Sequence, residues 1–306
     1  MLRQSKWFAV ENPDRPALAV GRACVRDRLR WVWRMLGRTA LAAPGRTDEV
    51  HQLRVATRRA TTALDLFGDM FAADDIAWVA KRLKKLRRAA GAARDRDVIH
   101  LHYAGLPDSA RPPHGVLRKL AKRSEKARPE ILELLKSLRE KAFLTRAREA
   151  LRKPLKTRAK LDFRAFAQKH FAGQWAIFVD ASEGDLTSID ALHEFRLRTK
   201  SLRYALETLV AALPQSARET LYPRVTALQE ALGEINDHAV ALATLQEFAA
   251  AKRGKGKLAR WAAAEIPTRR AALDTAHVAF LQRWPDLRRD LFADVASLGL
   301  EHDSAA

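Results

Sequence analysis

The stretch His51–Val98, HQLRVATRRATTALDLFGDMFAADDIAWVAKRLKKLRRAAGAARDRDV, decides the fold because it occurs twice. It aligns without a gap to His193–Val240, HEFRLRTKSLRYALETLVAALPQSARETLYPRVTALQEALGEINDHAV, at a constant offset of 142 residues. Unrelated helices often share Leu and Ala, but rarely a His, an Arg and a Gly-x-x-x-Asp motif in one register. The repeat predicts two copies of one structural unit, each large enough to be a helical bundle. Eleven pairs of positions are identical: His51/His193, Arg54/Arg196, Thr57/Thr199, Ala63/Ala205, Leu64/Leu206, Arg82/Arg224, Leu86/Leu228, Ala89/Ala231, Gly91/Gly233, Asp95/Asp237 and Val98/Val240.

The composition of the chain predicts an all-α fold. Its 306 residues allow about two domains of roughly 100–200 residues each. Ala, Leu, Arg, Lys and Glu dominate, Gly and Pro are sparse, and alternating runs of β-branched residues are missing. We therefore expect a pair of helical bundles whose helices pack antiparallel through short loops.

The repeat and the composition together predict the organisation of the chain. We expect an N-terminal extension (residues 1–15), a first helical-bundle repeat (16–152), a basic linker (153–160), a second helical-bundle repeat (161–300) and a tail (301–306).

Helix boundaries follow from apolar spacing, caps and breakers. The first repeat is expected to contain helices from Pro16 to about Ala42, from Thr47 or Asp48 to Phe67, and from Asp74 or Asp75 to a stop at Gly91. Gly233 is expected to end the corresponding helix of the second repeat, and Asp95 and Asp237 to cap the helices that follow. The alternative role for these two aspartates is to orient a neighbouring arginine. A long helix over about 258–281 and a short one after Pro285 complete the prediction.

The charge of the chain indicates an anionic partner. With 56 Lys and Arg against 36 Asp and Glu, the formal net charge is +20. Such self-repulsion favours binding to a nucleic acid, a phosphate polymer or an acidic membrane surface. Cys24 is the only cysteine, which excludes an intrachain disulfide and a thiol metal cluster. The first sixteen residues carry too short an apolar stretch for a signal peptide or a membrane span, so a cytoplasmic protein is expected.

One face of the His51 helix carries a row of cations. His51, Arg54 and Arg58 fall within one narrow stripe at about 100° per residue. Cations spaced three and four residues apart repel one another, so the row is expected either to be fully solvated or to hold an anion. In the second copy, the matching stripe consists of His193, Arg196, Lys200 and Tyr204, flanked by Arg203.

The helix after His51 repeats this design. Lys81, Lys84, Lys85 and Arg88 share one face, while Val79, Leu83 and Leu86 share the opposite face. Such a charge run on one helix face is commonly only the solvated side. Arg and Lys side chains nevertheless bind phosphate oxygens well, and we include these four in the candidate site.

The two copies resemble the halves of a CHAD domain, the conserved histidine α-helical domain family. The resemblance is carried by HQLRVATRR and HEFRLRTKSLRYALETL, followed at the same distance by LRRAAGAARDRDV and LQEALGEINDHAV, and it extends from about Pro16 to Leu298. It implies two four-helix bundles related by a pseudo-two-fold, with basic residues lining a groove or pore between or along them. It also implies binding of inorganic polyphosphate and, for some members, association with polyphosphate granules.

The resemblance assigns phosphate contacts by motif. In the first half these are His51, Arg54, Arg58 and Arg59; in the second they are His193, Arg196, Lys200, Arg203 and Tyr204. The first copy has Thr61 and Thr62 where the second has Arg203 and Tyr204, so unequal contributions are expected. No Glu-x-Glu-x-Lys signature of a fused triphosphate tunnel metalloenzyme is present.

Two other functions stay open. A nucleic-acid-binding protein would share the charge, but such proteins usually interleave aromatic residues with basic ones, and only 7% of this chain is aromatic. An enzyme acting on phosphate esters or polyphosphate could use the paired histidines, but neither a His-Glu-x-x-His spacing nor an acidic magnesium cluster is present. We therefore expect binding without catalysis, no catalytic or metal-ligating residues, no cofactor and no membrane partner, and leave the oligomeric state open.

Overall fold

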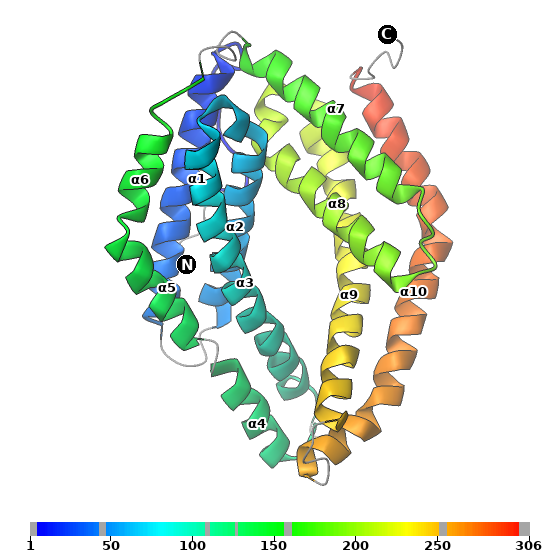
Figure 1. Cartoon of the computed structure of the whole chain (residues 1–306). Helices are drawn as coiled ribbons and strands as arrows, with labels where there is room; N and C mark the ends of the chain where they lie inside the picture. The colour runs from blue at the N-terminus through cyan, green and yellow to red at the C-terminus, as the bar shows by residue number, and fades with distance from the viewer. Residues whose placement is uncertain are drawn as a thin grey trace. The chain divides into compact units, whose positions relative to one another are not determined.

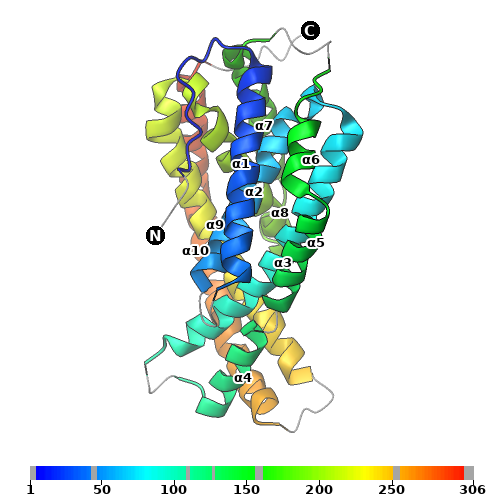
Figure 2. The ribbon, with the colours of Figure 1, turned by 90° about the vertical axis from the view of Figure 1, so that its left-hand side faces the viewer.

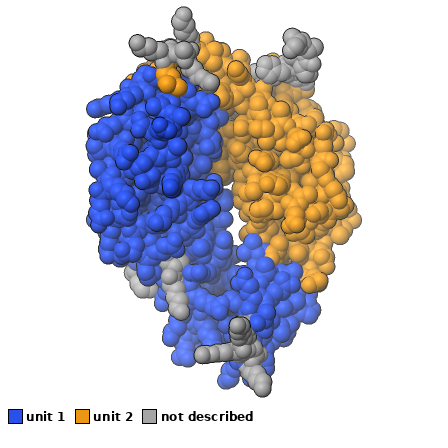
Figure 3. All heavy atoms as spheres, in the orientation of Figure 1, with its two compact units in different colours: residues 1–3, 25–154, 240–269 blue, residues 4–24, 155–239, 270–306 orange. Residues whose placement is uncertain are grey.

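All regular elements in the described part of the chain are helical (Figure 1). The computed structural model describes residues 5–42, 47–107, 111–125, 128–155, 161–250 and 256–299. Parts of the predicted N-terminal extension and linker, and the whole predicted tail, lie outside these residues. The chain divides into two compact units (Figure 3). The first contains residues 25–154 and 240–269, and the second contains residues 4–24, 155–239 and 270–306, so each unit takes a segment from the other half of the sequence.

The first unit is built around α3 (Ala73–Ala104), on which α2 (Thr47–Phe67) packs. Helices α4 (His114–Glu125), α5 (Arg128–Glu140) and α6 (Phe143–Ala150) also contact α3. The part of α1 (Ala17–Ala40) that belongs to this unit runs beside α6 in both views (Figures 1 and 2). Leu53, Ala60 and Leu64 of α2 are buried, as their spacing predicted.

A second apolar cluster closes the far end of α3. Ile99 and Tyr103 of α3 pack there with residues of α4, of α9 (Tyr222–Ala250) and of α10 (Lys257–Ser297). The Tyr103 and Trp261 rings meet edge to face, with centroids 4.9 Å apart. This cluster explains why a segment of the second sequence half belongs to the first unit.

The second unit contains α7 (Phe163–Ser182), α8 (Ile189–Leu209) and the remaining parts of α1, α9 and α10. The Asp162 side chain caps α7 by accepting a 2.7 Å hydrogen bond from the Ala165 amide. Aromatic rings pack against one another in the core of this unit. The Phe195 ring of α8 lies 5.3 Å from Phe178 of α7 and 5.0 Å from Trp284 of α10.

Helix bounds in the two sequence copies coincide at the repeat offset. Helix α2 ends at Phe67 and is followed by a 3-10 turn, Gly68–Met70. Helix α8 ends at Leu209 and is followed by the turn Val210–Ala212, each bound lying 142 residues further on. The copies then differ, since a π-helical turn (Ala217–Leu221) precedes α9 whereas α3 begins without one.

The predicted breaks at Gly91 and Gly233 are wrong. Helix α3 continues through Gly91 to Ala104, and α9 continues through Gly233 to Ala250. Asp95 and Asp237 therefore lie inside helices and cap nothing. A helical glycine costs only about 1 kcal/mol relative to alanine, and burial of flanking residues such as Leu86 and Leu228 outweighs that cost.

The prediction of two helices at the C-terminal end is also wrong. Helix α10 runs unbroken from Lys257 to Ser297 and includes Pro285. The proline removes one backbone donor, but buried Trp284 and Leu291 on either side of it hold the helix against its neighbours.

Candidate anion-binding site

In the first unit, Arg54 of α2 is held by Asp95 of α3. The Arg54 Nη1 atom lies 3.1 Å from the Asp95 Oδ1 atom. The side chains are 23% and 49% exposed, so the pair lies at the surface with part of each charge facing solvent. The packing of α2 on α3 thus gives Asp95 the orienting role that a helix cap would have excluded.

The other predicted residues of α2 lie around this pair at different depths. His51 is exposed, whereas Arg58 and Arg59 are half-buried. Thr57, between them in sequence, is fully buried and donates its hydroxyl to the Arg54 carbonyl at 2.9 Å. The stripe is therefore most accessible at His51, since Arg54 is half-buried like Arg58 and Arg59.

The predicted basic face of α3 is open to solvent. Lys81, Lys84, Lys85 and Arg88 are all exposed, while Leu83 on the opposite face is buried. Within the described residues none of the four basic side chains forms an ion pair or a hydrogen bond. From Lys81 to Arg88 the helix rises about 10 Å, so the four cations form a short ladder of unneutralised charge.

In the second unit, His193 of α8 is exposed and contacts Asn236 of α9. Its Nδ1 atom lies 3.1 Å from Asn236 Oδ1. An amide oxygen only accepts hydrogen bonds, so Nδ1 carries the proton in this arrangement. The contact leaves Nε2 as the ring nitrogen available to a ligand. Asn236 also donates to Asp237 at 3.4 Å, which links the recurring aspartate to the histidine of its own copy.

The two cations after His193 are much less accessible than their counterparts in α2. Arg196 and Lys200 are each only 8% exposed. Burial of a charge weakens its solvation and strengthens its field on any neighbouring group. These two residues can contribute to anion binding mainly through that field and through their outermost atoms.

Arg203 is engaged by partners inside its own unit. Its Nε atom donates to Gln229 Oε1 at 2.6 Å, and its Nη1 atom donates to Glu207 Oε1 at 3.0 Å. The Glu207 carboxylate, which is completely buried, also accepts a 3.0 Å hydrogen bond from the Tyr222 hydroxyl. Burial raises the pKa of Tyr222, and the nearby Glu207 charge raises it further. The network therefore occupies the guanidinium that the motif assigned to phosphate.

Tyr204 is likewise part of this interior. It is 5% exposed, and the Arg203 guanidinium carbon lies 4.4 Å from its ring centroid. Burial lowers the pKa of Arg203, but Tyr204 and Glu207 outweigh that effect and the pKa lies above the ordinary arginine value. The first copy has threonines in place of Arg203 and Tyr204, so this network belongs to the second copy alone.

Arg82 and Arg224, which occupy the same position in the two sequence copies, have different contacts. Arg224 of α9 lies 3.2 Å from Asp294 and donates to the Asp290 carbonyl at 2.9 Å. Its counterpart Arg82 lies over the Trp78 ring, with the guanidinium carbon 3.8 Å from the centroid. Burial and the nearby Arg146 charge lower the pKa of Arg82. Sequence identity at this position therefore does not give the two arginines the same partners.

Neither the charge pattern nor the repeat revealed the His193–Asn236 contact. The constant spacing between the His-Arg motif and the Gly-x-x-x-Asp motif is the signal that could have found it, because it fixes which turns of two packed helices face each other. A cavity of about 410 Å³ between α9 and α10, lined by Glu234, His238 and Arg283 among others, contains none of the predicted residues.

The described residues offer neither a metal-binding cluster nor a membrane-spanning helix. In these ranges no three or more His, Cys, Asp or Glu side chains group in a way that could hold a metal ion. No helix there has the length and apolarity needed to cross a bilayer.

Comparison with known proteins identifies the fold and the family. The structure is similar to a crystal structure of the CHAD domain from the plant Ricinus communis, with a TM-score of 0.65 and 21% identity over 97% of this chain and 96% of that one. It is also similar to PptA from Streptomyces chartreusis, with a TM-score of 0.56 and 18% identity over 88% of this chain and 99% of that one. No curated protein sequence matches. The model of the CHAD domain matches residues 34–246, which include every predicted contact residue, and the chain therefore belongs to the CHAD domain family.

Proposed function

We propose that this protein binds inorganic polyphosphate, without turning it over, through basic side chains of α2, α3 and α8. The main support is the ladder of Lys81, Lys84, Lys85 and Arg88, which are exposed and have no acidic partner within the described residues. A flexible, narrow anion with one charge per phosphate would neutralise such a ladder. Family membership also supports polyphosphate as the ligand, because the resemblance to CHAD domains implies polyphosphate binding.

The residues of the site have different roles in this proposal. His51, Arg54 and the α3 ladder contact phosphate oxygens directly, and Asp95 orients Arg54. Arg58 and Arg59 contribute at the half-buried end of the α2 stripe. In the second copy His193 donates from Nε2 to phosphate in its imidazolium form, which carries a proton on both ring nitrogens, and buried Arg196 and Lys200 supply positive potential.

Arg203 and Tyr204 support α8 from inside and do not contact the ligand. This replaces the direct contacts that the family motif assigned to them. The internal duplication is part of the proposal, since the coincident bounds of α2 and α8 support two copies of one helix pair. A cytoplasmic location on polyphosphate granules follows if the affinity is high.

A competition experiment tests the proposal. The full chain is bound to labelled single-stranded DNA and titrated with long-chain polyphosphate, and the reverse titration is performed at equal phosphate concentration. We expect polyphosphate to displace DNA at far lower concentration than DNA displaces polyphosphate, with affinity falling steeply as salt rises. Equal displacement in the two directions would support a nucleic-acid-binding protein instead.

Catalysis is tested with the same full-length protein and long-chain polyphosphate. Release of orthophosphate from long-chain polyphosphate is followed with and without Mg²⁺. We expect no turnover under conditions in which the polymer is fully bound. Sustained release that is lost in a His51→Gln, His193→Gln variant would overturn the binding-only proposal in favour of an enzyme.

A further inference from the structure

Helix α1 carries an arginine at every fourth position. These residues are Arg22, Arg26, Arg30, Arg34 and Arg38. Residues four apart are neighbours on a helix surface, and like charges at this spacing destabilise the helix by about 0.2–0.5 kcal/mol per pair. Arg26 and Arg30 precede the residues that the family model matches, which begin at residue 34. The ridge contains none of the residues that the His-Arg motifs assign to phosphate, so its row of like charges needs its own explanation.

The arginines of this ridge in the first unit differ in their partners. Arg38 lies 3.7 Å from the Glu49 carboxylate, and Arg34 lies over the Trp31 ring at 5.4 Å. Arg26 and Arg30 are exposed, and across the described ranges neither forms a hydrogen bond, an ion pair or a ring contact. The middle of the ridge thus carries two adjacent unneutralised guanidinium groups.

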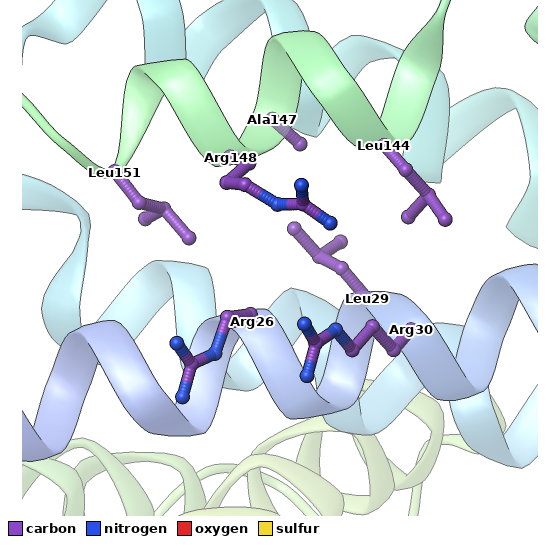
Figure 4. A pocket seen from close by; sticks show the side chains of 7 residues that line it. All are labelled: Arg26, Leu29, Arg30, Leu144, Ala147, Arg148 and Leu151. Atoms are coloured by element: carbon purple, nitrogen blue, oxygen red, sulfur yellow. The ribbon is translucent and has the colours of Figure 1, made fainter.

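A third arginine reaches this place from α6. Arg148, also exposed and without a partner among the described residues, extends into the space between α6 and α1 (Figure 4). The three arginines line a cavity of about 20 Å³ with Leu29, Leu144, Ala147 and Leu151. Leu29, Ala147 and Leu151 are each no more than 3% exposed, so the floor is apolar, and no acidic residue lines the cavity.

We propose that Arg26, Arg30 and Arg148 form a second site, which binds successive phosphate groups of a linear polyphosphate. Arginine suits this ligand because its planar fork donates two parallel hydrogen bonds to phosphate oxygens. The apolar floor strengthens the attraction by lowering the local dielectric constant. The cavity is too small to enclose a phosphate chain, so the chain lies across its rim and inserts only oxygen atoms. This site rests on the proposed function for its ligand but uses none of the basic residues of α2, α3 and α8 named there.

The test compares two variants of equal charge. Arg26→Gln, Arg30→Gln and Arg148→Gln are combined in one full-length variant. Its control combines Arg118→Gln, Arg139→Gln and Arg260→Gln, three exposed arginines of the same unit that do not line this cavity. Tripolyphosphate binding is measured by calorimetry, and urea unfolding verifies that both variants remain folded.

We expect wild-type protein to bind tripolyphosphate at two classes of site and the cavity variant to lose one class. Affinity at that class should fall at least about tenfold below the control, equivalent to about 1.4 kcal/mol. If the cavity variant and the control behave alike while tripolyphosphate still binds, the second site does not exist and the proposed function stands. If wild-type protein binds neither tripolyphosphate nor long-chain polyphosphate, the proposed function fails and the second site fails with it.

Discussion

Arg54 of α2 and Asp95 of α3 form an ion pair with Nη1 and Oδ1 3.1 Å apart, on the helix pair that carries most of the proposed phosphate contacts of the first unit. Both residues recur in the second copy, as Arg196 and Asp237. An acidic side chain in an anion-binding surface weakens the local potential. Its presence is explained if it fixes the position of a long, mobile arginine.

Asp95→Asn separates orientation from charge. Asparagine keeps an oxygen that accepts a hydrogen bond from Arg54 but removes the competing negative charge, so polyphosphate affinity should rise by about two- to fivefold, within the range of one exposed ion pair. Stability should change by less than about 1 kcal/mol. Isothermal titration calorimetry measures the affinity. The gain should vanish in an Arg54→Gln background, and a gain of equal size there would show that Asp95 acts without Arg54.

The ladder on α3 can be removed as a unit. Combining Lys81→Gln, Lys84→Gln, Lys85→Gln and Arg88→Gln should reduce the slope of log affinity against log salt by about 3, because four phosphate contacts are lost at about 0.7 each. Circular dichroism should show unchanged helicity. The control neutralises Arg118, Lys119, Lys122 and Lys257, which are also exposed in the first unit. If the slope falls equally in the control, the four ladder residues act only through the net charge of the protein and do not contact phosphate.

Arg203→Met tests the buried network of α8. The substitution breaks the ion pair of Arg203 with the fully buried Glu207 carboxylate, and loss of one partner of a buried pair typically costs about 3–5 kcal/mol. Urea unfolding should show this loss, and polyphosphate affinity of the folded variant should stay within about twofold of wild type. If stability is unchanged and binding is strongly weakened, Arg203 contacts the ligand directly.

Asp294 is expected to make stability depend on pH. Burial raises the pKa of this carboxyl above its ordinary value of 3.8, although the Arg224 charge opposes the shift. The folded protein then holds the proton more tightly than the unfolded chain, so the free energy of unfolding falls as pH rises from about 4 through the raised pKa. Urea unfolding between pH 3.5 and 7 should show a smaller decline in Asp294→Asn than in wild type. The exposed Asp274→Asn is the control, and an identical decline in all three proteins would contradict this assignment.

Gly91→Ala is expected to stabilise the protein. An added Cβ at Gly91 would meet no heavy atom within 4 Å apart from its chain neighbours and the backbone of its own helix, and alanine favours a helix interior by about 0.5–1 kcal/mol. Thermal unfolding should register the gain while polyphosphate affinity stays unchanged. Weaker binding in this variant would mean that the ligand approaches the α3 backbone at this glycine.

The sequence predicted most helices because their signals are local. The spacing of Leu53, Ala60 and Leu64 predicted the buried face of α2. The predicted start of α1 at Pro16 lies one residue before the observed start, and the predicted end of α2 at Phe67 is the observed end. Gly91 and Pro285 misled the prediction because intrinsic propensity is a weak influence that packing overrides. Burial of the residues around each breaker was decided by other helices, far away in sequence.

The site was predicted at the level of faces but not of partners. The exposed ladder of α3 followed from periodicity alone. The hydrogen-bond partners of Arg203 are Glu207, Tyr222 and Gln229. The last two lie beside α8 only because α9 packs there. The arginines of α1 recur every four residues in the sequence, but the prediction of this helix rested on its apolar positions alone.

Three helices, α1, α9 and α10, each begin in one compact unit and end in the other. No single cut in the chain would therefore release either unit whole, since any fragment would lack a helical segment that its own core requires. Halves expressed separately should be insoluble or molten, while the intact chain should melt in one cooperative step. A substitution that unfolds one unit would then also remove helical segments that continue into the other unit.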